Sequence, residues 1–154
     1  MTSYFLDSSA VVKRYVPERG TPWVRALTTQ STGTTIFVAR MTQAEVISGV
    51  WRRVREGTII PRTAHAIRLL VDRHTQREYL VIELTARIVH RAEGLLEQHP
   101  LRAYDAVQLA SALESNARLV GVDLPPLVFV AADTRLLTAA SSEGLTIDDP
   151  NAYP

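Results

Sequence analysis

The sequence predicts an α/β protein in which helices cover both faces of a parallel sheet. Two observations carry this prediction. Short apolar segments alternate along the chain with amphipathic helical segments, which is the order expected of parallel strands joined by helices. The strand-like segments are also continuously apolar rather than alternating, as strands buried on both faces are. We therefore expect the strands to end along one common edge of a sheet.

The individual elements follow from local patterns. The expected strands are short apolar runs rich in β-branched residues, and they span Thr2–Leu6, Thr34–Ala39, Glu78–Leu84, Leu127–Ala132 and Leu145–Ile147. The expected helices are bounded by capping residues, proline or glycine. They span Ala10–Tyr15, the segment between the second strand and Gly57, Pro61–His74, Thr85–Gln98, Arg102–Asn116 and Leu136–Ser142.

The composition is that of an ordinary globular chain. With 154 residues, 46% hydrophobic and 21% charged, we expect residues 1–154 to form a single domain with a buried core. The absence of cysteine excludes disulfides, zinc–thiolate sites and cysteine nucleophiles. No signal peptide or membrane span is recognisable, so a cytoplasmic location is expected. The net charge of +1 does not by itself indicate nucleic-acid binding.

Four acidic residues fall where this topology reaches one edge of the sheet. Asp7 and Asp133 each follow an apolar strand directly, and Glu45 and Asp105 lie in the first turns of helices. Open parallel sheets bind ligands at the carboxyl ends of their strands. Clustered carboxylates repel one another, and a hard cation such as Mg²⁺ or Mn²⁺ relieves that repulsion. The pattern therefore predicts a metal site suited to phosphodiester cleavage by activated water.

Each acid also has a purely structural interpretation. Asp7 and Asp133 are suitable helix N-caps, and Asp105 is suitably placed to complement a helix dipole. Glu45 fits a capping box with Thr42, in the sequence Thr-Gln-Ala-Glu. For any one residue capping is the favoured role, whereas four acids gathered at one edge favour a metal site. The two roles are compatible.

Four segments of the chain resemble the PIN-domain signatures of VapC-type toxins, in the same order and over nearly the whole length. They are YFLDSSAVVKRYVPE, MTQAEVISGVWRR, LRAYDAVQLASAL and FVAADTRLLTAASSEGL. The resemblance implies a three-layer α/β/α sandwich with a central parallel sheet. It implies an Mg²⁺- or Mn²⁺-dependent endoribonuclease that uses Asp7, Glu45, Asp105 and Asp133. It also implies a toxin held inactive by a cognate VapB-type antitoxin, usually as a homodimer.

Further residues are candidates for supporting roles. The small hydroxyl residue that the family carries after its first acid corresponds to Ser8. Many relatives carry another acid shortly after the last one, where this chain has Thr134, so the number of bound metal ions, one or two, is open. Lys13, Arg14 and Arg135 lie near the acids in sequence. They are either phosphate contacts or solvated surface charges.

The helix that carries Glu45 presents two further patterns. Its basic residues are Arg52, Arg53 and Arg55, which form either an RNA path or an ordinary exposed face. Its apolar residues include Val46, Ile47 and Trp51. They are either plain core or part of a groove that receives the antitoxin, and for Trp51 the core interpretation is preferred.

Two other functions stay open. An aspartate after the first strand also occurs in aspartyl-phosphate phosphatases, but these need a second aspartate two residues later, where this chain has Ser9. A PIN-like module that binds RNA or protein without catalysis is the other alternative. The presence of all four acids argues against it.

Overall fold

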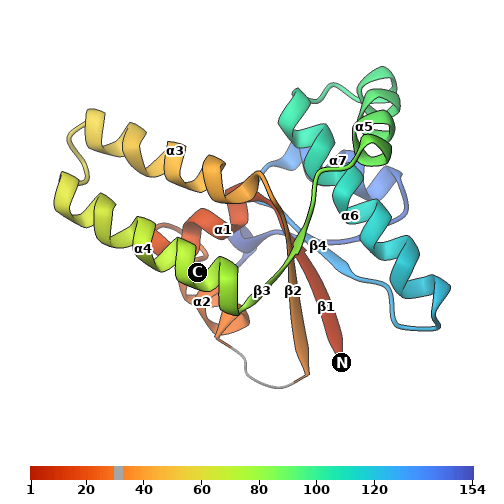
Figure 1. Cartoon of the computed structure of the whole chain (residues 1–154), viewed down its shortest axis with the longest axis horizontal. Coiled ribbons are helices and arrows are strands. Elements are labelled where there is room, and N and C mark those ends of the chain that lie inside the picture. The colour runs from red at the N-terminus through yellow and green to blue at the C-terminus, as the bar shows by residue number, and fades with distance from the viewer. Residues whose placement is uncertain (30–32) are drawn as a thin grey trace.

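A single parallel sheet forms the centre of the molecule. The computed structural model describes residues 1–29 and 33–154. Its five strands lie in the order β3-β2-β1-β4-β5, and every pairing is parallel (Figure 1). The strands are β1 (Thr2–Leu6), β2 (Thr34–Ala39), β3 (Tyr79–Ile82), β4 (Val128–Val130) and β5 (Thr146–Asp148). The predicted parallel sheet is confirmed.

Helices cover both faces of this sheet. They are α1 (Ser8–Tyr15), α2 (Thr21–Thr28), α3 (Thr42–Arg55), α4 (Pro61–Arg77), α5 (Ala86–Gln98), α6 (Ala103–Gly121) and α7 (Thr134–Ser142), followed by the short 3₁₀ helix η1 (Pro150–Ala152). Figure 1 shows α1 to α4 on one side of the strands and α5 to α7 on the other. The predicted three-layer α/β/α sandwich is therefore confirmed.

The core divides along the sheet because successive strand residues point to opposite faces. Phe5 and Phe129 are fully buried and belong to the cluster under α5, α6 and α7, where their rings stack 5.9 Å apart. Leu6 and Val130, the next residues along the same two strands, belong to the cluster under α1 to α4. Burial on both faces explains why these strands are apolar at every position.

The structure differs from the sequence-based prediction mainly in α2 and η1, which were not expected. Gly20 and Pro22 signal a chain break, but a proline in the first turn is also typical of a helix start. Gly20 has φ +83°, and a Cβ there would lie 2.3 Å from the carbonyl oxygen of Pro150 in η1. The C-terminal segment thus packs closely against the start of α2, where Trp23 stacks on Tyr153 at 4.6 Å.

The remaining differences concern the ends of elements. Helix α4 continues to Arg77 rather than His74, and α6 continues to Gly121 rather than Asn116, while β3 is shorter than expected. Such ends are set by contacts beyond the local sequence. Within the described part of the chain, no helix combines the length and the apolar character that crossing a membrane requires.

Candidate active site

The carboxyl edge of the sheet brings the predicted acids to one region. Asp7 directly follows β1 and is the N-cap of α1. Asp133 is the N-cap of α7, but two residues separate it from β4, which ends at Val130 rather than at the expected Ala132. Because β1 and β4 are neighbours, the two strand ends are adjacent, and the Asp7 amide donates to the carbonyl of Val130 at 3.1 Å. Glu45 and Asp105 lie in the first turns of α3 and α6.

Asp7 is the most buried of the four acids, with 2% of its surface exposed. Its Oδ1 accepts hydrogen bonds from the Ser9 hydroxyl at 2.6 Å and from the Ala10 amide at 3.1 Å. Burial raises the pKa of Asp7 to about 7, against the lowering effect of these bonds, and the nearby charge of Asp105 raises it further. The Ser9 hydroxyl also accepts from the Ala132 amide at 2.8 Å, which ties Asp7 to the end of β4.

Glu45 is held by two side chains from other elements. Its Oε2 accepts from the Ser8 hydroxyl at 3.0 Å, and its Oε1 accepts from the Gln108 amide group at 2.8 Å. Gln108 is 1% exposed and also donates to the Thr42 hydroxyl at 2.9 Å. The predicted capping box is therefore wrong, because the N-cap of α3 is Met41 and makes no side-chain capping bond. The carboxylate of Glu45 faces the sheet edge instead.

Asp105 and Asp133 line one cavity of about 250 Å³ together with Glu45. Burial raises the pKa of Asp105, and the charge of Asp133 raises it further, while Arg102 and Arg135 act in the opposite direction. Asp133 Oδ1 accepts from the Arg135 amide at 2.9 Å, so this residue caps α7 and lines the cavity at once. The capping and site roles proposed for Asp133 are thus structurally compatible.

The donor chemistry of this edge fits a hard divalent cation. All four acids offer oxygen ligands, which Mg²⁺ and Mn²⁺ prefer. Their negative charge is not fully compensated, since neighbouring acids raise the pKa of both Asp7 and Asp105. In residues 1–29 and 33–154, however, no three Asp, Glu or His side chains lie close enough together to hold one ion as they are placed. The structure brings the acids to a shared edge but leaves their carboxylates apart.

A second cavity of about 500 Å³ adjoins the first, because Glu45 and Arg102 line both. Arg52 and Arg53 of α3 line it as well, so these two arginines lie beside the acids. Arg53 also pairs with Glu18 at 3.1 Å. The position of Arg102 here was not predicted, although its place at the start of the helix that carries Asp105 was a usable signal.

Two predicted phosphate contacts have other partners. The Arg14 guanidinium is buried, pairs with Glu78 at 2.6 Å and donates to the Tyr79 hydroxyl at 2.7 Å. Arg14 is therefore a structural residue that joins α1 to β3, which corrects its predicted phosphate contact. Lys13 lines the second cavity, but it is 5% exposed and its amine pairs with Glu18 at 3.3 Å.

The other predicted residues divide between two places. Ser8 contacts the site through Glu45. Arg135 is exposed and lines the cavity that holds the acids. Thr134 is exposed and lines a separate hollow of about 280 Å³ with His99 and Arg135. Thr134 is thus beside the acid cavity, not among the residues that line it.

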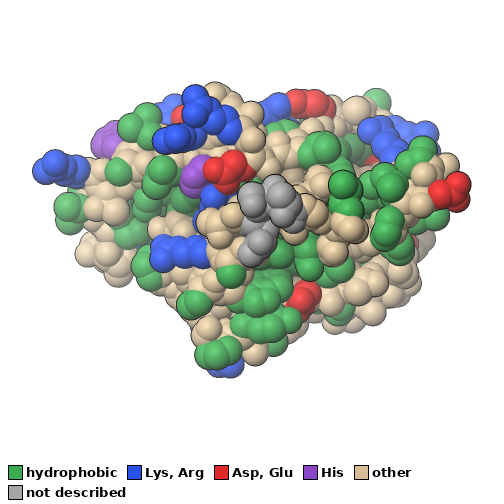
Figure 2. Space-filling view, turned by 90° about the horizontal axis from the view of Figure 1, so that it is seen from below, with side chains coloured by type: hydrophobic (Ala, Val, Ile, Leu, Met, Phe, Trp, Pro, Cys, Tyr) green, Lys and Arg blue, Asp and Glu red, His purple; other side chains and the backbone are tan. Residues whose placement is uncertain are grey.

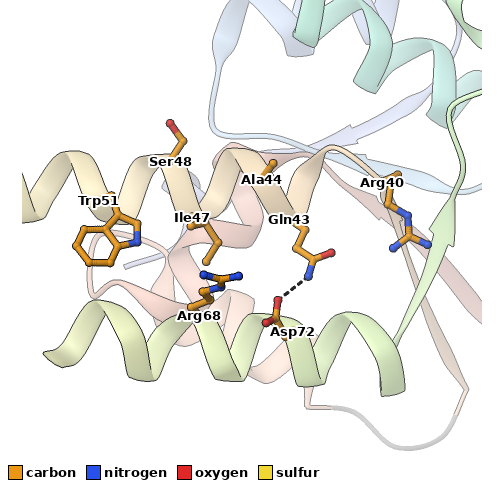
Figure 3. Close-up of a pocket in the computed structure, with 8 residues that line it drawn as sticks. All are labelled: Arg40, Gln43, Ala44, Ile47, Ser48, Trp51, Arg68 and Asp72. Carbon is orange, nitrogen blue, oxygen red and sulfur yellow. Dashed lines mark hydrogen bonds between the residues drawn. The ribbon is translucent and has the colours of Figure 1, made fainter. Parts of the chain in front are cut away.

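A fourth hollow, of about 560 Å³, lies between α3 and α4, and none of the four acids lines it. Figure 3 shows Ile47 of α3 opposite Arg68 of α4, and the amide of Gln43 bonded to the carboxylate of Asp72 at 2.6 Å. Trp51 lies further along α3, where its ring meets that of His65 edge-on at 5.1 Å. Ile47 and Trp51 are half-buried and accessible from this groove, whereas Val46, predicted with them, is core at 1% exposure. We call this hollow the α3–α4 groove.

The face seen in Figure 2 differs from the carboxyl edge. Acidic side chains are scattered singly over it, among arginines and apolar side chains, and do not gather in one place. On this face, therefore, no group of acids resembles the one at the carboxyl edge.

The comparisons with known proteins agree with this architecture. The profile of the PIN domain family matches residues 4–139. A search of curated proteins finds no match. Among solved structures, PAE2754 from Pyrobaculum aerophilum is similar, with a TM-score of 0.64, 18% identity and coverage of 98% of this chain and 85% of that one.

Two further structures resemble the chain over most of their length. One is from VapBC2 of Rickettsia felis bound to a DNA fragment from its promoter, with a TM-score of 0.63, 13% identity and coverage of 96% and 98%. The other is VapC20 of Mycobacterium tuberculosis, described as a Sarcin-Ricin loop cleaving toxin, with a TM-score of 0.60, 15% identity and coverage of 98% and 99%. At these identities the structures support the fold, and the family profile spans most of the chain. The chain belongs to the PIN-domain family.

Proposed function

We propose that this protein is a metal-dependent endoribonuclease and acts as the toxin of a toxin–antitoxin pair. The observation that carries the proposal is the shared cavity of Glu45, Asp105 and Asp133, beside the buried Asp7. Mg²⁺ or Mn²⁺ bound there would supply an activated water and stabilise the charge that develops on the cleaved phosphodiester. The PIN-domain family and the similarity to VapC20, which is described as a Sarcin-Ricin loop cleaving toxin, support this proposal.

The residues around the two cavities have three roles in the proposed reaction. The four acids would hold the cation, once their side chains turn toward one another. Ser8 and Gln108 orient Glu45 through their hydrogen bonds, and Ser9 orients Asp7. Arginines that line the two adjoining cavities contact the substrate phosphates, and they are Arg52, Arg53, Arg102 and Arg135.

The raised pKa of Asp7 has a direct consequence for binding. Near neutral pH a substantial fraction of this carboxyl group carries a proton, because its pKa is about 7. A cation binds the ionised form, so cation binding should release the proton. We therefore expect cleavage to increase with pH between about 6 and 8.

The decisive experiment combines RNA cleavage with conservative variants. The purified protein is incubated with RNA in Mg²⁺, in Mn²⁺ and in EDTA. Asp105→Asn should reduce cleavage by more than about 100-fold while circular dichroism and thermal unfolding stay unchanged. Asp123→Asn is the matched control, because Asp123 is exposed beyond the far end of α6 and the substitution changes the net charge equally. If Asp105→Asn retains full activity, or EDTA has no effect, the metal site is refuted.

The same assay, with an RNA-binding measurement and a phosphomonoester as a second substrate, separates the two open alternatives. A catalytically inactive PIN-like module would bind RNA without cutting it in any metal. A phosphatase would release phosphate from a phosphomonoester and leave RNA intact. Position 9, where a phosphatase needs its second aspartate, is Ser9, whose hydroxyl is bonded to Asp7.

We further propose that the α3–α4 groove receives the antitoxin. Ile47 and Trp51 offer half-buried apolar surface there, and Arg68 offers a charge. The VapBC complex among the similar structures supports a partner of this class. Trp51→Ala should weaken co-purification of the co-expressed antitoxin, whereas Leu69→Ala, on the exposed surface of α4, should not. Equal recovery with both variants would place the antitoxin elsewhere. A homodimer and a cytoplasmic location stay predictions.

A further inference from the structure

Tyr104 is an exposed aromatic residue that lines the cavity of Glu45, Asp105 and Asp133. It lies in the first turn of α6, directly before Asp105, and 56% of its surface is exposed. Among the Phe, Tyr and Trp side chains of residues 1–29 and 33–154, it is the only one that is exposed. An aromatic ring is costly to leave in water, since it is one of the largest apolar groups a side chain carries.

Three of the other four tyrosines have hydrogen-bond or stacking partners within the fold. Tyr15 and Tyr79 are buried, and their hydroxyl groups bond to each other at 3.1 Å. Tyr153 stacks on Trp23 and bonds to Asp148. In the described part of the chain, the side chain of Tyr104 has neither a hydrogen bond nor a stacked aromatic partner. Tyr4 also lacks both, but it is half-buried and packs against the core under α1 to α4. Among the described tyrosines, Tyr104 is therefore the one whose ring is both unpartnered and exposed.

The neighbours of Tyr104 indicate what its ring meets. It lines the cavity of about 250 Å³ with Glu45, Asp105 and Asp133, so a group stacked on the ring lies beside the acids. Arg102 and Arg135 line the same cavity, and both are exposed. The aromatic ring of Tyr104 can stack on a base. The two guanidinium groups that line the same cavity can bind the phosphates on either side of that base.

We propose that Tyr104 is a platform on which an unpaired base of the substrate stacks, next to the cleaved phosphodiester. The inference rests on the proposed function and adds a substrate-binding residue to it. A base within a duplex is stacked on its neighbours and has no free face for Tyr104. An unpaired base has one, and aromatic side chains commonly read single-stranded RNA in this way.

Binding in EDTA tests the proposal apart from catalysis, because no cleavage occurs there. Fluorescence anisotropy gives the Kd of a labelled single-stranded RNA for the wild type, Tyr104→Leu, Tyr104→Phe and Tyr104→Trp. Tyr104→Leu should weaken binding by about 5- to 150-fold, the range that base–aromatic stacking contributes, while Phe and Trp preserve it. Duplex RNA of the same sequence should bind the wild type and Tyr104→Leu equally. Val122→Ala, exposed beyond the other end of α6, is the control.

A second measurement identifies the base as the partner. An RNA of the same length made of abasic nucleotides should bind the wild type more weakly than the normal RNA, yet it should bind the wild type and Tyr104→Leu equally. A 2-aminopurine base in the normal RNA should be quenched by the wild type and not by Tyr104→Leu. Equal Kd values for wild type and Tyr104→Leu on the normal RNA, or an equal loss on the abasic RNA, would overturn the proposal.

The outcome also separates this inference from the proposed function. If Mg²⁺ supports cleavage while Tyr104→Leu binds as the wild type does, the nuclease stands and the stacking platform is refuted. If binding depends on the Tyr104 ring but neither Mg²⁺ nor Mn²⁺ supports cleavage, the platform stands and the nuclease is refuted.

Discussion

Replacing Asp7 with asparagine should stabilise the metal-free protein at pH 8. The folded protein holds the Asp7 carboxyl group with a pKa of about 7, mainly because the group is buried, whereas its ordinary value is 3.8. The folded state therefore binds the proton more tightly than the unfolded state does. The free energy of unfolding then falls as pH rises from about 4 to about 7, and the full cost of a buried charge is present above that range.

The magnitude follows from the two pKa values. Each pH unit between them changes the free energy of unfolding by about 1.4 kcal/mol, which gives a total of about 4 kcal/mol. Asparagine removes the charge with little other change. Both the Ser9 hydroxyl and the Ala10 amide donate to Oδ1, and asparagine keeps an oxygen at that position, so the cap of α1 is preserved.

Urea unfolding in EDTA at pH 4, 5.5 and 8 measures the effect. Relative to wild type, Asp7→Asn should gain about 4 kcal/mol between pH 4 and pH 8. Asp123→Asn, which changes the net charge equally at an exposed site, should run parallel to wild type. Mg²⁺ at pH 8 should then raise the Tm of wild type and leave that of Asp7→Asn unchanged, because only the wild type has the full ligand set. Parallel pH profiles for Asp7→Asn and wild type would refute the claim that burial destabilises this charge.

Three further outcomes are expected. Ser9→Ala removes a hydroxyl that donates to Asp7 and accepts from the backbone after β4, so urea unfolding should show a loss of about 1–3 kcal/mol; a loss near zero would contradict this link. Gly20→Ala should lower the Tm more than Gly57→Ala, because both glycines have positive φ but only at Gly20 does a Cβ meet the carbonyl of Pro150; equal shifts would mean that the close approach is unimportant. RNA binding should weaken as salt concentration rises. If the four cavity arginines each neutralise one phosphate, a plot of the logarithm of the association constant against the logarithm of salt concentration should have a slope of about −3. A slope near zero would exclude these arginines as phosphate contacts.

Local patterns explain why much of this edge was predictable. Asp7 directly follows β1, Asp133 follows β4 after two alanines, and both start helices, so the strand, the cap and the carboxylate are all encoded within a few residues. Two parallel strands that are neighbours bring their carboxyl ends together whatever the details of packing. The fold class and the site of the acids could therefore be inferred before any tertiary contact was known.

Hydrogen-bond partners were beyond this reasoning. Thr42 and Glu45 fit a capping box in sequence, yet both bond to Gln108, which is 63 residues from Glu45 along the chain. Arg14 has the appearance of a free cation near Asp7, but its partner Glu78 is 64 residues away. Nothing near Thr42 or Arg14 in sequence distinguishes these outcomes.

By itself, the sequence determined the alternation of strands and helices, the parallel sheet and the edge at which the acids fall. These features depend on apolar periodicity and chain-breaking residues, which act over short stretches of chain. Only the tertiary structure decided that Arg14 is buried, that Gln108 holds Glu45 and that Tyr104 stands exposed beside the acids. The burial of a side chain and its hydrogen-bond partners depend on which distant segments pack together. Those contacts form only when the helices pack on the two faces of the sheet.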